Sequence, residues 1–195
     1  DASWKFSPAK RWGTFPSVSA AWRISEEPFF KTFTGDGRVL NDLKLRASYG
    51  QLGDDNVRPN NADLDPFAYN PGYSYNTGVG IMSGITTVAA RDRGIAHDRI
   101  SWLTAKVTDI GLDFGLLNNK ITGTLDYFRR NRDGLPAVKN DVFVPSELGY
   151  ALPQENLERD AVIGGEGSLT YNGNVRGVRF TLGGNVSYAR GRFIQ

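Results

Sequence analysis

Hydrophobic and polar residues alternate with a period of two in six stretches of this chain. Successive side chains of a β-strand point to opposite sides, so each stretch predicts a strand with one apolar and one polar face. In the second stretch, Leu43, Leu45, Ala47 and Tyr49 alternate with Lys44, Arg46 and Ser48. The six predicted strands cover residues 17–25, 43–53, 109–116, 121–127, 163–171 and 178–188. We therefore expect an all-β, antiparallel fold.

The connections between these strands alternate between very short and very long. Asn118-Asn119 and Asn172-Gly173-Asn174 are typical of tight hairpin turns, whereas residues 53–103 and 131–160 form long links that we expect to be structureless. In an up-and-down meander both tight turns lie at one end and both long loops at the other. The intermediate connection, 26–41, belongs to the tight-turn end and predicts a short helix around residues 28–30. This arrangement is typical of transmembrane β-barrels with short periplasmic turns and long extracellular loops, and is uncommon in compact soluble domains.

The charged residues of the predicted strands agree with a barrel wall. A Lys or Arg facing lipid at mid-membrane costs about 2–4 kcal/mol, so charges should lie on the face opposite the apolar residues. The residues that meet this condition and are predicted to face a wet lumen are Arg23, Lys44, Arg46, Asp113, Asp126, Glu166 and Arg179.

Composition excludes several classes of protein. The 195 residues include 23 basic and 21 acidic residues in mixed order, so no basic stripe predicts a nucleic-acid partner. Cysteine is absent, which excludes a disulfide framework and a thiolate metal site. No apolar run approaches the ~20 residues of a spanning helix, but a spanning strand needs only ~9–11 residues, of which every second one is apolar. Since Asp1 is not an initiator Met and no signal peptide is visible, we expect an internal piece of a longer protein.

No motif predicts a catalytic, cofactor or metal site. His97 is the only histidine, which makes a zinc site improbable. The loop acids Asp54, Asp55, Asp63 and Asp65 offer oxygen ligands for Ca²⁺ but lack the spacing of a calcium loop. We therefore expect no catalytic residues, no cofactor and no metal, and a protein that is not an enzyme.

The first long loop contains three tyrosines among amide side chains, namely Tyr69, Tyr73 and Tyr75. Aromatic rings stack on sugar faces, so these residues are candidates for contact with a substrate or a partner protein. The other interpretation is that the three rings pack on neighbouring loop residues.

Three motifs in succession resemble one protein family. Residues 4–30 read WKFSPAKRWGTFPSVSAAWRISEEPFF, residues 40–56 read LNDLKLRASYGQLGDDN, and residues 109–130 read DIGLDFGLLNNKITGTLDYFRR. In this order they are similar to segments of the SusC/RagA family of TonB-dependent receptors. Residues 167–190 fit the family more loosely.

The resemblance implies functions beyond those that the alternating pattern predicts. Family members are outer-membrane transporters of Gram-negative bacteria, with a plugged barrel of about 22 strands. They work with a SusD-like surface lipoprotein and with the TonB complex, and import glycan oligosaccharides or peptides. We expect residues 1–195 to be part of the barrel domain, about six strands in outer-membrane lipid, with no plug domain and without the regions that contact TonB. The basic strand residues Arg23, Lys44, Arg46 and Arg179 could then line the solute path or contact the plug. The other interpretation is that they form structural salt bridges to Asp113, Asp126 or Glu166.

Two other hypotheses remain open at the level of sequence. The same alternation would suit a soluble or surface β-sandwich that binds carbohydrate. A β-sheet enzyme that processes glycans is the third hypothesis, because paired carboxylates can serve as acid and nucleophile.

Overall fold

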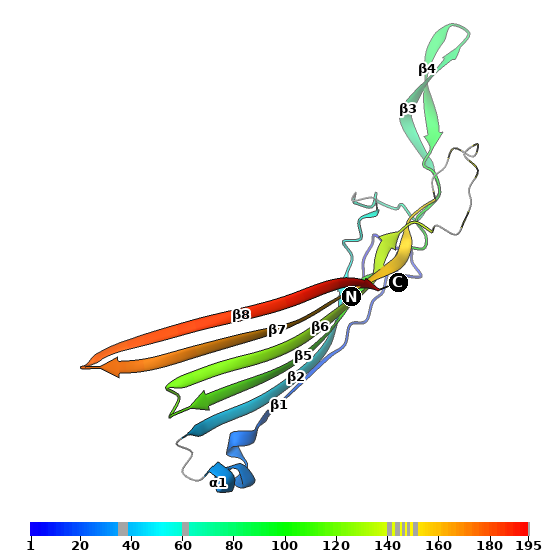
Figure 1. Cartoon of the computed structure of the whole chain (residues 1–195). Helices are drawn as coiled ribbons and strands as arrows, with labels where there is room; N and C mark the ends of the chain where they lie inside the picture. The colour runs from blue at the N-terminus through cyan, green and yellow to red at the C-terminus, as the bar shows by residue number, and fades with distance from the viewer. Residues whose placement is uncertain are drawn as a thin grey trace.

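The fold is dominated by one open antiparallel sheet (Figure 1). The computed structural model describes residues 1–34, 39–59, 63–139, 142, 145, 147, 149 and 152–194. In the described residues the strands are β1 (Ser17–Arg23), β2 (Leu40–Asp54), β3 (Tyr73–Met82), β4 (Ile85–Asp92), β5 (Leu103–Leu116), β6 (Ile121–Ala137), β7 (Glu155–Val175) and β8 (Val178–Ile194). The sheet order is β1, β2, β5, β6, β7, β8, and β3 pairs with β4 alone. The predicted six-stranded up-and-down meander is confirmed.

One face of the sheet, the apolar face, carries hydrophobic side chains in rows that cross all six strands. The central row is Trp22, Leu45, Leu112, Leu125, Gly167 and Val186, each residue paired with the next. The neighbouring row is Ala20, Ala47, Ile110, Tyr127, Gly165 and Tyr188. These rows are exposed: Leu125 has 54% and Val186 72% of its surface accessible. An apolar surface of this extent calls for an apolar neighbour outside the chain.

No second layer covers the apolar face within the described part of the chain. The hairpin of β3 and β4 extends away from the sheet instead of lying on it (Figure 1). The β-sandwich hypothesis, which requires two packed sheets, is therefore wrong. Among the described residues, no helix has the length and apolarity needed to cross a membrane.

The tight turns lie at one end of the sheet, as predicted, but one of them is displaced. The first turn centres on Asn118 and Asn119, with φ values of 56° and 59°. The second lies at Arg176-Gly177, not at the predicted Asn172-Gly173-Asn174. Both turn residues have positive φ, 52° and 87°, as a two-residue hairpin turn requires, and glycine adopts this conformation without strain. The strand pairing continues through residues 172–175, where the ring of Phe180 lies over Gly173 on the paired strand.

Between β1 and β2, also at the tight-turn end, lie the short helices η1 (Ile24–Glu26) and α1 (Pro28–Thr34). The helix predicted around residues 28–30 is confirmed. Strand β1 ends at Arg23, so the predicted extension to residue 25 is wrong.

At the opposite end, the first long loop contains the β3–β4 hairpin, and the expectation of a structureless loop is wrong for this segment.

Apart from Phe30 of α1, the buried hydrophobic side chains of the described residues lie toward the long-loop end of the sheet. Phe6, Val57 and Ile100 form a small core against which Trp102 packs. The rings of Phe6 and Phe15 meet Trp102 edge-on, with centroids 5.4 and 5.2 Å away. The N-terminal segment is thereby fixed beside the loops that follow β2 and precede β5.

Candidate functional site

The polar face of the sheet carries an ion-pair network centred on Arg46 of β2. Its guanidinium Nη2 lies 2.9 Å from Asp113 Oδ1 on β5 and 2.8 Å from Asp126 Oδ1 on β6. Lys44 Nζ lies 3.7 Å from the other oxygen of Asp113. Three strands are thus joined by charges that lie on the same side, since all four residues alternate with apolar neighbours. We call these four residues the Arg46 network.

Gly111 makes the contact between Arg46 on β2 and Asp126 on β6, which crosses β5, geometrically possible. It lies in β5, paired with Arg46 on one side and with Asp126 on the other. A Cβ atom at this position would approach Asp126 Oδ1 to 2.3 Å and Arg46 Nη2 to 2.8 Å. Because Gly111 has no side chain, Arg46 on β2 can reach across β5 to Asp126 on β6.

The structure places the three other predicted strand charges on the polar face but outside this network. Arg23 is paired in register with Lys44, Glu166 with Asp126, and Arg179 with Asn174 near the second turn. None of the three forms an ion pair with another residue that the structure describes. The predicted salt bridges are confirmed for Asp113 and Asp126 and wrong for Glu166 within the described residues.

Sequence reasoning missed a second ion pair on the polar face, nearer the long loops. Arg132 of β6 donates through Nε to Asp160 Oδ1 of β7 at 2.8 Å, and Asp160 is 9% exposed. This pair lies beyond the apolar rows, toward the long loops. The hydrogen bond from Arg132 holds the pKa of the Asp160 carboxyl below its usual value. Continuing the predicted alternation of β6 and β7 by a few residues would have placed both side chains on this face.

The predicted loop tyrosines lie on and beside the β3–β4 hairpin. Tyr73 and Tyr75 belong to β3 and are 65% and 76% exposed. Tyr69 lies in the turn before the hairpin, with its ring edge-on to Phe67 at 6.1 Å. The packed interpretation thus describes Tyr69, whereas Tyr73 and Tyr75 have accessible rings.

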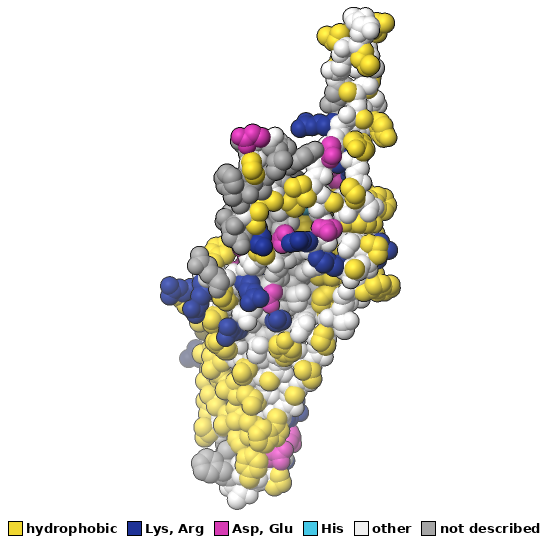
Figure 2. All heavy atoms as spheres, turned by 90° about the vertical axis from the view of Figure 1, so that its right-hand side faces the viewer, with side chains coloured by type: hydrophobic (Ala, Val, Ile, Leu, Met, Phe, Trp, Pro, Cys, Tyr) yellow, Lys and Arg dark blue, Asp and Glu magenta, His cyan; other side chains and the backbone are white. Residues whose placement is uncertain are grey.

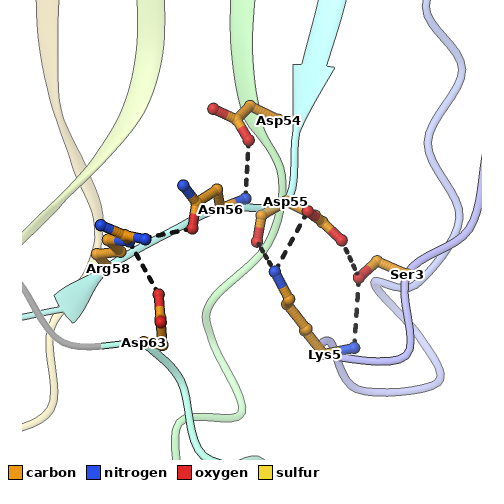
Figure 3. Close-up of polar contacts among 7 residues, drawn as sticks. All are labelled: Ser3, Lys5, Asp54, Asp55, Asn56, Arg58 and Asp63. Carbon is orange, nitrogen blue, oxygen red and sulfur yellow. Dashed lines mark hydrogen bonds and ion pairs between the residues drawn. The ribbon is translucent and has the colours of Figure 1, made fainter.

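Of the four loop acids, Asp54, Asp55 and Asp63 are engaged by basic and polar groups of the protein (Figure 3). Asp55 accepts hydrogen bonds from Ser3 at 2.8 Å and from Lys5 at 3.4 Å, which ties the N-terminal segment to the end of β2. Asp54 accepts from the Asn56 backbone at 2.8 Å, and Asp63 pairs with Arg58 at 2.8 Å. No group of three or more metal-ligating side chains occurs in the described ranges.

Comparisons with known proteins were made by sequence and by structure. No family model matches the chain. It is 40% identical to the TonB-dependent receptor SusC of Bacteroides thetaiotaomicron over 141 residues, 71% of this chain, and 29% identical to the TonB-dependent receptor P39 of Formosa agariphila over 182 residues. The chain spans only 13% and 16% of the lengths of these relatives.

Solved structures of a transporter have the same fold. The RagAB peptide transporter matches 98% of this chain with a TM-score of 0.73 at 19% identity, and its importer form in the open-open state matches with a TM-score of 0.76. The matched region is 19% of the length of the RagAB chain. These likenesses confirm the predicted antiparallel barrel wall.

Proposed function

Since this chain belongs to the SusC/RagA family of TonB-dependent receptors, we propose that it forms part of the wall of an outer-membrane nutrient importer. Residues 1–195 would all belong to the barrel domain. The apolar face would contact lipid, the polar face would line the lumen, and the long loops would be extracellular. The chain itself would carry out no bond chemistry.

The observation that carries this proposal is the separation of the two faces over the height of a membrane. Apolar residues occupy successive rows from Ile121 to Tyr127 of β6, and Arg129 marks the margin two residues further on. The eight residue steps from Ile121 to Arg129, at ~3.4 Å each and tilted by roughly 40°, rise about 20 Å, close to the ~25 Å apolar band of such barrels. The Arg46 network faces the other way throughout.

The Arg46 network suits the wall of a wet channel. In lipid an ion pair would lose hydration without replacement, whereas the side chains of Arg46 and Asp126 keep 35% and 22% of their surface accessible here. The network would hold three strands in register and present charge to a plug or a passing solute. Energy would come from the TonB complex through regions outside this chain.

The cargo we propose is an oligomeric nutrient, a glycan oligosaccharide or a peptide. The exposed rings of Tyr73 and Tyr75 support contact with such a cargo, or with a SusD-like lipoprotein that delivers it, because aromatic faces stack on sugar rings and pack against peptide side chains. Their place on a hairpin beyond the sheet is compatible with capture before transport (Figure 1).

Uptake by cells that express the complete receptor tests this function. We expect labelled oligosaccharides or labelled peptides to enter in a receptor-dependent manner, and a protonophore to abolish entry. The double variant Tyr73→Ala/Tyr75→Ala should reduce uptake at low concentration several-fold. The matched control, Val79→Ala/Ile81→Ala on the same strand and equally exposed, should leave it unchanged.

A receptor that reaches the outer membrane but supports no energy-dependent uptake of either class would refute the importer. An equal loss in the tyrosine and control variants would refute aromatic recognition while leaving the importer standing.

A further inference from the structure

A groove runs along β7 on the apolar face, because two of its positions there are glycines. Gly165 and Gly167 have no side chains, whereas the residues paired with them on β6 and β8 have large ones that project from the sheet. The walls are Leu125 and Tyr127 on β6 and Val186 and Tyr188 on β8. Together with Leu45 on β2 and Ile110 and Leu112 on β5, these residues line a depression of about 430 Å³. We call it the glycine groove.

The glycine groove is open above the backbone of β7 and bounded on both sides by apolar side chains. The backbones of β6 and β8 are two strand spacings apart, roughly 10 Å, and no side chain rises between them at the two glycines. A Cβ atom at Gly165 would meet nothing nearer than a backbone oxygen at 3.5 Å. At Gly167 it would lie 3.3 Å from Leu125 and 3.7 Å from Val186, which form the two walls.

Arginines flank the long-loop end of this groove. In the next row, Arg129 of β6 and Arg190 of β8 lie on either side of Ile163, and Arg192 follows one row further along β8. All three arginines are exposed. Space-filling atoms show basic side chains gathered above the apolar surface, toward the loops (Figure 2).

The positive charge of these arginines is largely uncompensated. Among the described residues, Arg190 and Arg192 contact no carboxylate, and Arg129 donates only to the neutral Asn131 at 3.1 Å. The acid nearest in register, Asp133, already pairs with Lys106 at 2.9 Å and with Arg159 at 3.5 Å.

We propose that this site binds a phosphorylated membrane lipid, with an acyl chain in the glycine groove and the phosphate between Arg129 and Arg190. Guanidinium groups bind phosphate oxygens through paired, charge-assisted hydrogen bonds, and the apolar walls exclude water from the chain. A free phosphate ion would use the arginines but not the groove, whereas a lipid uses both. The inference rests on the proposed function for one point, the contact of the apolar face with the bilayer. The arginines then lie at the margin where lipid headgroups begin.

Lipid retention by the complete receptor, purified in detergent and measured by native mass spectrometry, tests the site. The probes are diphosphoryl lipid A, its dephosphorylated form and inorganic phosphate. The double variant Arg129→Gln/Arg190→Gln removes the phosphate ligands, and Gly165→Leu fills the groove without touching them. The matched control is Arg130→Gln/Arg179→Gln, which removes two arginines from the polar face of the same strands. Heat-modifiable gel mobility confirms that each variant has a folded barrel.

We expect the arginine variant to bind diphosphoryl lipid A about 30-fold more weakly, at roughly 1 kcal/mol per arginine near a membrane surface. The groove variant should also lose lipid, and the control should keep it. Equal loss in the control, or equal binding of the dephosphorylated form, would overturn the proposal. So would a groove variant that retains lipid while inorganic phosphate competes fully, because the site would then bind a free anion. Retention needs no transport, so a receptor that binds lipid but imports nothing counts against the importer alone.

Discussion

Replacing Val186 by arginine probes the assignment of the two faces most directly. Val186 belongs to the central apolar row, about 10 Å from either margin of the apolar band. Arginine at the bilayer midplane on the lipid face destabilises a barrel by about 2–4 kcal/mol, which lowers the ratio of folded to unfolded protein roughly 30- to 900-fold. Ser187, the next residue, provides a matched control. It lies on the polar face opposite Glu166, so Ser187→Arg should cost close to nothing.

The measurement is the free energy of unfolding of the complete receptor in lipid vesicles, from urea titration followed by heat-modifiable gel mobility. The difference between the two variants matters more than either value, because both add the same side chain to adjacent positions of one strand. If Ser187→Arg were as destabilising as Val186→Arg, β8 would not separate lipid from water, and the barrel-wall reasoning would fail.

Two further predictions concern ion pairs on the polar face. Gly111→Ala should destabilise the protein by about 1–3 kcal/mol, because the new Cβ would push Arg46 away from Asp126, and replacing Asp126 by serine in addition should recover part of the loss. Unchanged stability of the single variant would contradict the described geometry. The pH dependence of unfolding should contain a contribution from the Arg132–Asp160 pair, because the pKa of Asp160 is lower in the folded protein than in the unfolded chain. The stabilisation from this pair is complete above the usual carboxyl pKa. It is lost as the pH falls through the lower pKa of the folded protein. Asp160→Asn should remove about 1–2 kcal/mol at neutral pH and show a smaller difference from the native protein in acid, and a constant difference at all pH values would refute the pair's role.

The alternation of side chains determined much of this protein from sequence alone. Which residues share a face depends only on the two-residue period of a strand, so Arg46, Asp113 and Asp126 could be assigned to one side without knowing their partners. The turn at Asn118-Asn119 could also be predicted from sequence, because a positive φ is a local requirement that asparagine tolerates. The family motifs agree with these local features.

Only the tertiary structure determined how strands that are distant in the sequence align with one another. The contact from Arg46 across Gly111 to Asp126 depends on how three strands align, and no local pattern specifies that alignment. The second turn moved to Arg176-Gly177 because pairing between β7 and β8 continued beyond the asparagines. The β3–β4 hairpin and the glycine groove could not be predicted from sequence for the same reason. Each depends on which residues lie opposite one another, and that arrangement exists only once the strands have paired.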